Sequence, residues 1–145
     1  SYGGYMCRRN EREEGVRSFE KAATTPFYRT PEIAWTNAGV CARGIPDPVR
    51  AESFFRRALE ENSRYPEALL QMADLTLAEN RALASRAFLQ RYEAVAPWGP
   101  DSLWLAVRVE ESLGDRTAAR SYARKLREEF PESREARMLE SGGGR

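Results

Sequence analysis

The chain has 145 residues and a nearly balanced charge, with 23 Lys and Arg against 22 Asp and Glu. This length fits one domain, and a domain of this size buries roughly 70% of the surface that its unfolded chain exposes. Charges of both signs alternate along the sequence, so there is no one-sided basic field to attract nucleic acid or an anionic membrane. We therefore predict that the chain does not bind nucleic acid.

The residue types also limit the chemistry. The sequence has no histidine and only two cysteines, which excludes Ser-His-Asp and Cys-His nucleophiles and a Cys₄ zinc site. Pairs of glutamates such as Glu110 and Glu111 are frequent, but neighbours on a helix point about 100° apart, so we interpret these pairs as solvated surface. We predict a binding protein rather than an enzyme, without catalytic residues, a metal site, a cofactor or a small-molecule substrate.

The sequence also bears on membrane attachment. No apolar run reaches the roughly 18 residues that predict a membrane span. The chain begins with Ser1 and not with methionine, which indicates a soluble part of a longer product. Any signal peptide or lipid anchor would then lie upstream of these residues.

Residues 35–66 have the pattern of one helix-turn-helix unit of the 34-residue tetratricopeptide (TPR) class. Gly39 in the first helix and Ala51 in the second have almost no side chain, so the two helices can cross closely. Trp35 and Phe55 are placed to fill the space around this crossing.

The unit recurs along the chain. Its small positions form four pairs, each 12 residues apart, at Gly3/Gly15, Gly39/Ala51, Ala73/Ser85 and Val107/Ala119. The pairs begin at intervals of 36, 34 and 34 residues, and such a fixed period is typical of a solenoid. We predict an all-α TPR solenoid, a right-handed superhelix that ends in a C-terminal capping helix.

The period divides the chain into one TPR domain at 1–140 and a flexible tail at 141–145. Local signals mark several helix ends: Pro31 restarts a helix after a long connection, Gly114 ends one and Asp115 caps the next. In chain order, we expect a partial or complete repeat at 1–25, repeats at 31–62, 66–96 and 100–130, and the capping helix at 132–140.

Two cysteines occupy related positions in the first two units. Cys7 and Cys41 are 34 residues apart, near the ends of two successive first helices, which lie side by side in a TPR stack. Facing thiols there could meet the Cα separation of roughly 5.5–6 Å that a disulfide needs. The spacing is equally consistent with two unrelated buried thiols.

Over essentially all of residues 1–140 the chain resembles the type IV pilus biogenesis and stability proteins of Gram-negative bacteria, the PilF/PilW-type pilotins. The long first connection, the cysteine after each of the first two core pairs and the segment LWLAVRV are more particular to this family than a TPR motif. The similar segments are YGGYMC, FEKAATTPFYRTPEIAWTNAGVCARG, AESFFRRALEENSRYPEALLQMADL and SLWLAVRVEESLGDRTAARSYARKLREEFPES.

The resemblance implies an outer-membrane lipoprotein whose lipid anchor lies upstream of this chain and which faces the periplasm. Such a protein helps the pilus secretin to reach the outer membrane and to form its multimeric ring, on which twitching motility depends. The resemblance to this family also implies a Cys7–Cys41 disulfide. The alternative function is a general TPR adaptor that scaffolds a different multiprotein complex.

In a TPR superhelix the first helices line a concave groove, which we expect to bind an extended or helical segment of a protein partner. Trp104 is the best single anchor because tryptophan is enriched among interface hot spots, although it could instead pack against the capping helix. The groove positions are Thr36, Asn37, Val40, Arg43, Leu70, Gln71, Asp74, Leu77, Trp104, Leu105, Arg108 and Glu111.

Overall fold

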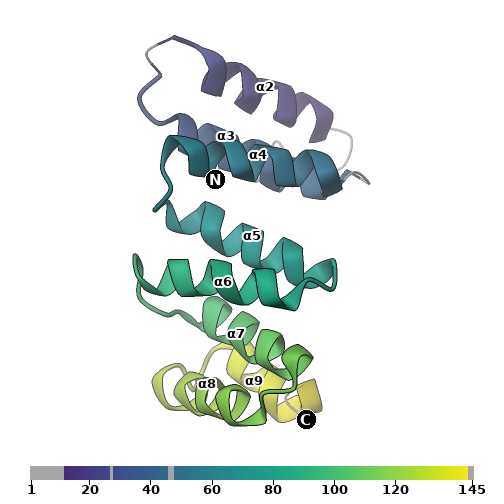
Figure 1. The fold of residues 1–145 in the computed structure, drawn as a ribbon, viewed down its shortest axis with the longest axis vertical. Coiled ribbons are helices and arrows are strands. Elements are labelled where there is room, and N and C mark those ends of the chain that lie inside the picture. Colours follow the sequence, from purple (N-terminus) through teal and green to yellow (C-terminus); the bar gives the residue numbers. More distant parts are fainter. Residues whose placement is uncertain (1–11, 27, 46–47, 144–145) are drawn as a thin grey trace. The chain divides into compact units, whose positions relative to one another are not determined.

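The structure, a computed structural model, describes residues 12–26, 28–45 and 48–143, and all regular elements in these ranges are helical (Figure 1). The all-α class is therefore confirmed. The helices are α2 (Arg12–Thr24), α3 (Pro31–Arg43), α4 (Pro48–Glu61), α5 (Pro66–Ala78), α6 (Ala82–Glu93), α7 (Pro100–Leu113), α8 (Arg116–Glu129), α9 (Arg134–Met138) and the π-helical turn η2 (Leu139–Gly143). Residues 141–143 thus belong to a helical turn, where we had expected the start of a flexible tail.

The chain divides into two compact units, Ser1–Met72 (unit 1) and Ala73–Arg145 (unit 2), and the boundary falls within α5. The expected repeats at 31–62 and 100–130 contain α3 with α4 and α7 with α8, respectively. Most of the first half of the expected repeat at 1–25 lies outside the described residues.

In unit 1, α3 packs against both α2 and α4, and the close crossing of α3 and α4 depends on Gly39 (Figure 1). A Cβ atom at this position would lie 2.6 Å from Cδ1 of Phe55, closer than side chains tolerate. Gly39, Ala51 and Phe55 are all buried. The predicted close contact at the small-residue pair Gly39/Ala51 is thereby confirmed.

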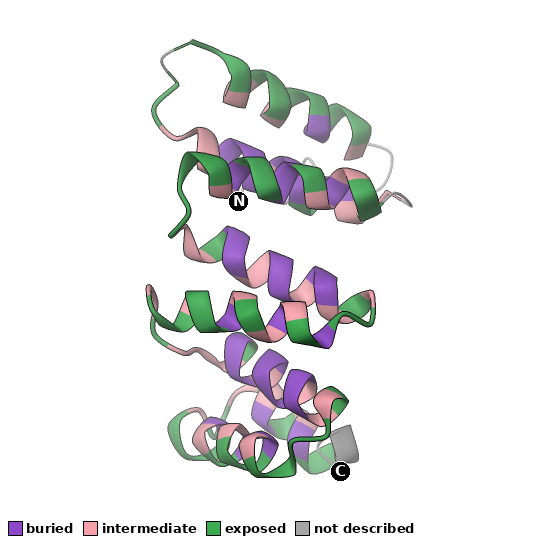
Figure 2. Cartoon of the chain, viewed as in Figure 1, coloured by how far each residue is buried: buried purple, intermediate pink, exposed green. Residues whose placement is uncertain are grey.

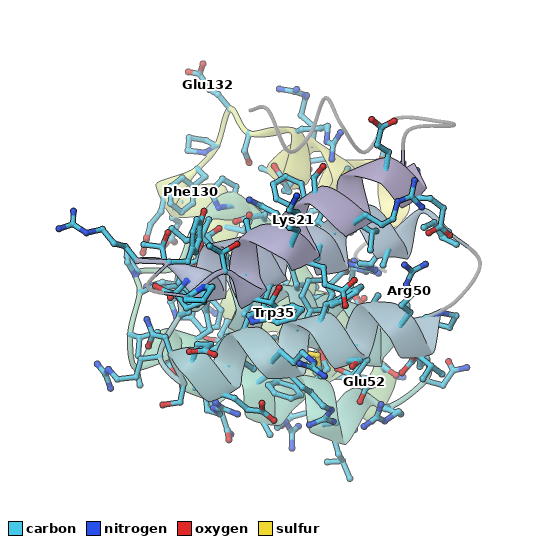
Figure 3. All side chains as sticks on the ribbon, turned by 90° about the horizontal axis from the view of Figure 1, so that it is seen from above. Lys21, Trp35, Arg50, Glu52, Phe130 and Glu132 are labelled. Carbon is cyan, nitrogen blue, oxygen red and sulfur yellow. The ribbon has the colours of Figure 1, made fainter. Side chains whose placement is uncertain are left out.

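An aromatic and cationic cluster joins α2, α3 and α4 of unit 1. Figure 3 labels two of its members, Trp35 and Arg50. The rings of Trp35 and Phe54 stack with their centroids 5.8 Å apart, and Cζ of Arg57 lies 5.0 Å from the Trp35 ring centroid. Arg50 lies over Phe54 and also donates from Nη1 to Oε1 of Glu13 at 2.9 Å. Side chains of α4 therefore hold both α3 and α2.

In unit 2, α7 packs against α6, α8 and α9. The small-residue pair predicted at Ala73/Ser85 is in contact, because Oγ of Ser85 donates to the carbonyl oxygen of Ala73 at 2.6 Å. The core cluster around α7 consists of Leu103, Val107, Ala123, Leu126, Ala136 and Leu139. The last two residues belong to α9 and η2, so this C-terminal segment covers part of the α7–α8 pair.

Helix ends in unit 2 follow the predicted signals. Gly114 adopts a left-handed conformation with φ of 79°, and the Asp115 side chain accepts from the Ala118 backbone N–H at 3.0 Å. The turn between α5 and α6 contains no glycine or proline; there Asn80 supplies the left-handed residue, with φ of 63°. Asparagine tolerates this conformation better than other residues with a Cβ.

The first helix of a pair is more deeply buried than the second (Figure 2). Seven residues are buried in each of α3 and α7, against four in α4 and three in α8. A first helix with neighbours on several sides keeps only a narrow exposed strip, and this strip decides which of its side chains can reach a partner.

Candidate interaction surfaces

The predicted groove residues of unit 1 lie on α3 and on the first half of α5. Nη1 of Arg43 donates to Oε1 of Gln71 at 3.0 Å, which ties α3 to α5 within this unit. Val40 is 37% exposed, while Asn37 and Leu70 are half-buried. This part of the surface is mixed, with apolar side chains beside amide and guanidinium groups.

In unit 2 the predicted residues lie on the second half of α5 and on α7, and three of them are connected. Cζ of Arg108 lies 6.0 Å from the centroid of the Trp104 ring, and Nη1 of Arg108 is 4.0 Å from Oδ1 of Asp74. Asp74 therefore helps to hold the guanidinium over the indole. We name the half-buried residues Asp74, Leu77, Trp104, Arg108 and Glu111 the Trp104 patch.

Two of the predicted groove residues are buried and offer little surface to a partner. Thr36 is 4% exposed, and its Oγ1 donates to the Glu32 carbonyl oxygen one turn earlier at 2.7 Å. Leu105 is also 4% exposed. One step of about 100° separates Leu105 from Trp104 and turns its side chain toward the interior of unit 2.

Trp104 was assigned two alternative roles, and its surroundings have features of both. The ring packs against the core cluster that includes Leu126 of α8 and Ala136 of α9. The side chain is nevertheless only half-buried, and Arg108 lies over its ring. Tryptophan and arginine are the residues most enriched among interface hot spots, so the exposed part suits a protein partner.

The charged side chains of the Trp104 patch are only weakly paired with one another. The side chains of Arg108 and Asp74 are 41% and 40% exposed, and an ion pair in such a place contributes at most about 1 kcal/mol. A partner can therefore exchange its own charges with this pair at low cost. Burial raises the pKa of Glu111, since a carboxylate with reduced access to water is harder to ionise.

A partly buried ion pair in unit 2, between Arg86 and Glu110, corrects one sequence prediction. Glu110, which we had interpreted as solvated surface, is 6% exposed. Its carboxylate accepts two hydrogen bonds from Arg86, one of them from Nε to Oε2 at 3.1 Å. Leu103, Val107 and Glu110 are spaced by four and then by three residues, so they lie on one face of a helix. This spacing was the sequence signal for the burial of Glu110, and sequence reasoning missed it.

The Arg86–Glu110 pair borders a polar cavity of about 160 Å³, which Trp98 and Tyr122 also line. The pKa of Tyr122 is raised, first by burial and then by the negative charges of Glu93 and Glu110. These groups link α6, α7 and α8. Removal of Arg86 would leave the buried Glu110 carboxylate without this partner, which is costly and indicates a structural role.

Only one of the two cysteines of the predicted disulfide lies in the part of the chain that the structure describes. Cys41 lies near the end of α3 and is fully buried. Cys7 lies outside the described residues, so the Cys7–Cys41 pairing stays a prediction.

Within residues 12–26, 28–45 and 48–143, no group of three or more cysteine, aspartate or glutamate side chains is arranged to hold a metal ion. Within the same part of the chain, no helix combines the length and the apolar character needed to cross a membrane.

The helix pairs and their small-residue crossings define a TPR-repeat protein, which confirms the predicted TPR solenoid class. Proteins of this class typically act as protein-interaction modules. The chain is similar to PilW, a widely conserved type IV pilus biogenesis factor, with 28% identity and a TM-score of 0.83 over 95% of this chain and 64% of that one. It is also similar to PilF of Pseudomonas aeruginosa, with 25% identity and a TM-score of 0.80 over 97% of this chain and 63% of that one.

Other similarities are consistent with this fold. A MamA RS-1 double mutant shares 17% identity at a TM-score of 0.77, over 91% of this chain and 73% of that one. Tetratricopeptide repeat protein 8 is 32% identical in Mus musculus and 30% in Homo sapiens, in both cases over 68% of this chain. The chain spans about a fifth of the length of these two curated relatives, 19% and 18%. No family model matches the chain.

Proposed function

We propose that this chain is a protein-interaction module of type IV pilus assembly, and that the full-length protein is a pilotin. In this role it promotes the outer-membrane localisation and the multimerisation of the pilus secretin. The observation that carries the proposal is the similarity to PilW at a TM-score of 0.83 over 95% of the chain. The resemblance of the sequence to the pilotin family supports the same role.

The Trp104 patch is the surface that we assign to the secretin. It combines an exposed part of the Trp104 ring with the guanidinium of Arg108, whose Nη1 lies 4.0 Å from Oδ1 of the half-exposed Asp74. Apolar anchors surrounded by exchangeable charges are typical of interfaces with an extended or helical segment. Leu77 adds apolar area on the neighbouring helix α5.

The proposal includes a location. A lipidated N-terminal cysteine upstream of this chain would anchor the protein at the periplasmic face of the outer membrane. The periplasm is oxidising, so the Cys7–Cys41 disulfide would persist there. Labelling of free thiols in protein purified from the periplasm, before and after reduction, tests this pairing.

The proposal is tested by deleting the gene in the host bacterium and measuring the heat- and detergent-resistant secretin multimer in outer-membrane fractions. We expect the multimer to be lost and to return with the intact gene. The variant Arg108→Glu should restore it poorly, because the reversed charge removes the cation beside Trp104.

The matched control is Arg124→Glu, which makes the same charge change at an exposed position of α8. This variant should restore the multimer fully. A multimer that persists in the deletion strain would contradict the pilotin role, and the general TPR adaptor for another complex would then be the better explanation.

A further inference from the structure

A second surface of unit 2, separate from the Asp74–Arg108 pair, lies between α7 and α8. The two helices enclose an open groove of about 570 Å³. Its floor is apolar, and its charged rim has three arginines and one glutamate. The lining residues are Val107, Glu111, Gly114, Arg116, Ala119, Arg120, Ala123 and Arg127.

Two of the rim arginines are available to bind an anion. Arg116 and Arg120 are exposed and are four residues apart, so they lie on one face of α8. Neither takes part in an ion pair with an acidic side chain of the described ranges. The third arginine, Arg127, pairs from Nε with Oε1 of Glu140 at 2.9 Å.

The segment that covers the other end of this helix pair shows what the surface accepts. Leu139 is buried in the core cluster together with Leu126, and the next residue, Glu140, binds Arg127. An apolar side chain on the α7–α8 pair and a carboxylate on an arginine of α8 thus come from adjacent positions. Arg127 belongs to the groove as well, so Glu140 reaches the edge of the groove.

The uncovered part of the groove repeats this chemistry. Ala119 and Ala123, which are 7% and 8% exposed, form a narrow apolar floor over which another helix can approach closely, while Val107 borders the groove but is only 1% exposed. Arg116 and Arg120 lie on α8 where they can bind carboxylates, as Arg127 binds Glu140 at the covered end. On the opposite wall Glu111 carries the only acidic group of the lining, which confines further carboxylates to the α8 side.

We propose that this groove docks an acidic amphipathic helix of a partner protein. Its apolar side chains contact Ala119, Ala123 and the apolar stems of the rim arginines, and two carboxylates four residues apart bind Arg116 and Arg120. This site shares Glu111 with the Trp104 patch, but its other residues are different, and it does not depend on the role in pilus assembly. It assigns a partner chemistry, acidic and amphipathic, to a surface of which the predicted groove residues included only Glu111.

The test uses the 145-residue chain and a fluorescently labelled, capped peptide of about 14 residues, long enough for some helix to form. The peptide carries leucine and alanine on one face and glutamates four residues apart beside them. Fluorescence anisotropy should show saturable binding that weakens as salt rises. The double variant Arg116→Glu/Arg120→Glu should bind about tenfold more weakly, since two attractions become repulsions.

Comparison of the matched variants Arg120→Glu and Arg124→Glu distinguishes binding in this groove from non-specific electrostatic attraction of the peptide to the arginines of α8. Both residues are exposed on α8, but only Arg120 lines the groove. We expect Arg120→Glu to weaken binding several-fold and Arg124→Glu to change it less than about twofold. Circular dichroism checks that all variants keep their helix content.

Three results would overturn the proposal: no saturable binding of the acidic peptide, equal binding of a peptide in which glutamine replaces each glutamate, or equal losses for Arg120→Glu and Arg124→Glu. None of these results bears on the secretin multimer. A failure of the proposed function is likewise separate, because it would leave the binding of this peptide unchanged.

Discussion

Trp35 in unit 1 and Trp104 in unit 2 occupy first helices of their pairs, and each has an arginine over its ring, but their exposure differs. Trp35 is 4% exposed, stacked on Phe54 and covered by Arg57, whose Cζ is 5.0 Å from the ring centroid. Trp104 is half-buried, and Cζ of Arg108 is 6.0 Å from its ring centroid.

The difference follows from where the arginine comes from. Arg57 belongs to α4, so the second helix of the pair closes over Trp35. Arg108 is four residues after Trp104 on α7 itself, and a neighbour on the same helix covers one side of the ring only. The same pair of residue types therefore closes off a core tryptophan in one unit and forms a candidate interaction surface in the other.

The largest expected effect is that of Trp35→Ala. Truncation of a fully packed tryptophan should lower the free energy of unfolding by about 3–5 kcal/mol, a large part of the total for a domain of this size. Urea denaturation followed by circular dichroism measures this loss. Trp35→Phe, which keeps a ring against Phe54, should lose less than half as much, and a loss below about 1 kcal/mol for Trp35→Ala would show that the ring is not core.

Trp104→Ala should have an intermediate effect on stability and a larger one on binding. The buried part of the ring predicts a loss of roughly 1–3 kcal/mol in the free energy of unfolding. Binding to a soluble secretin fragment should weaken at least tenfold at temperatures where the variant is still folded. A stability loss equal to that of Trp35→Ala, with binding by the folded fraction unchanged, would assign Trp104 to the core.

Some of these structural features could be predicted from the sequence, and others could not. The crossings at Gly39/Ala51 and Ala73/Ser85 were predictable, because a small residue at a fixed interval has a local steric consequence. The burial of Leu105 was not, because it depends on how many neighbours surround α7. Glu110 was misassigned for a related reason: its partner Arg86 is 24 residues away in sequence, on another helix.

A smaller effect is expected from replacing each arginine with methionine, which keeps much of the apolar stem. Arg57→Met should lower the free energy of unfolding by about 0.5–1 kcal/mol through loss of the cation–π contact with Trp35. Arg108→Met should cost less than about 0.5 kcal/mol in stability, since the ring that it covers is partly solvated and its pairing with Asp74 is exposed. Its effect should appear in secretin binding instead, measured by titration calorimetry, and equal stability losses for the two variants would remove the distinction between the rings.

The smallest expected effect concerns Glu111, at the end of the Trp104 patch. Burial raises the pKa of this carboxyl above its ordinary value of 4.5, so the folded state binds its proton more tightly than the unfolded state does. The contribution of Glu111 to stability is therefore fully present below pH 4.5 and is lost as the pH rises through the raised pKa. Glu111→Gln removes the ionisation and should raise stability at pH 7 by less than about 1 kcal/mol, because the half-buried group is screened by water.

Thermal unfolding at pH 7 and pH 4 checks this sign, with Glu128→Gln on the exposed side of α8 as a control for the same change in net charge. The gain from Glu111→Gln should shrink at pH 4, where the glutamate is itself largely protonated. A gain of equal size at both pH values, or one matched by Glu128→Gln, would mean that desolvation of this carboxyl is not its cause. The Trp104 patch would then tolerate a charge at position 111 as easily as open helix surface does.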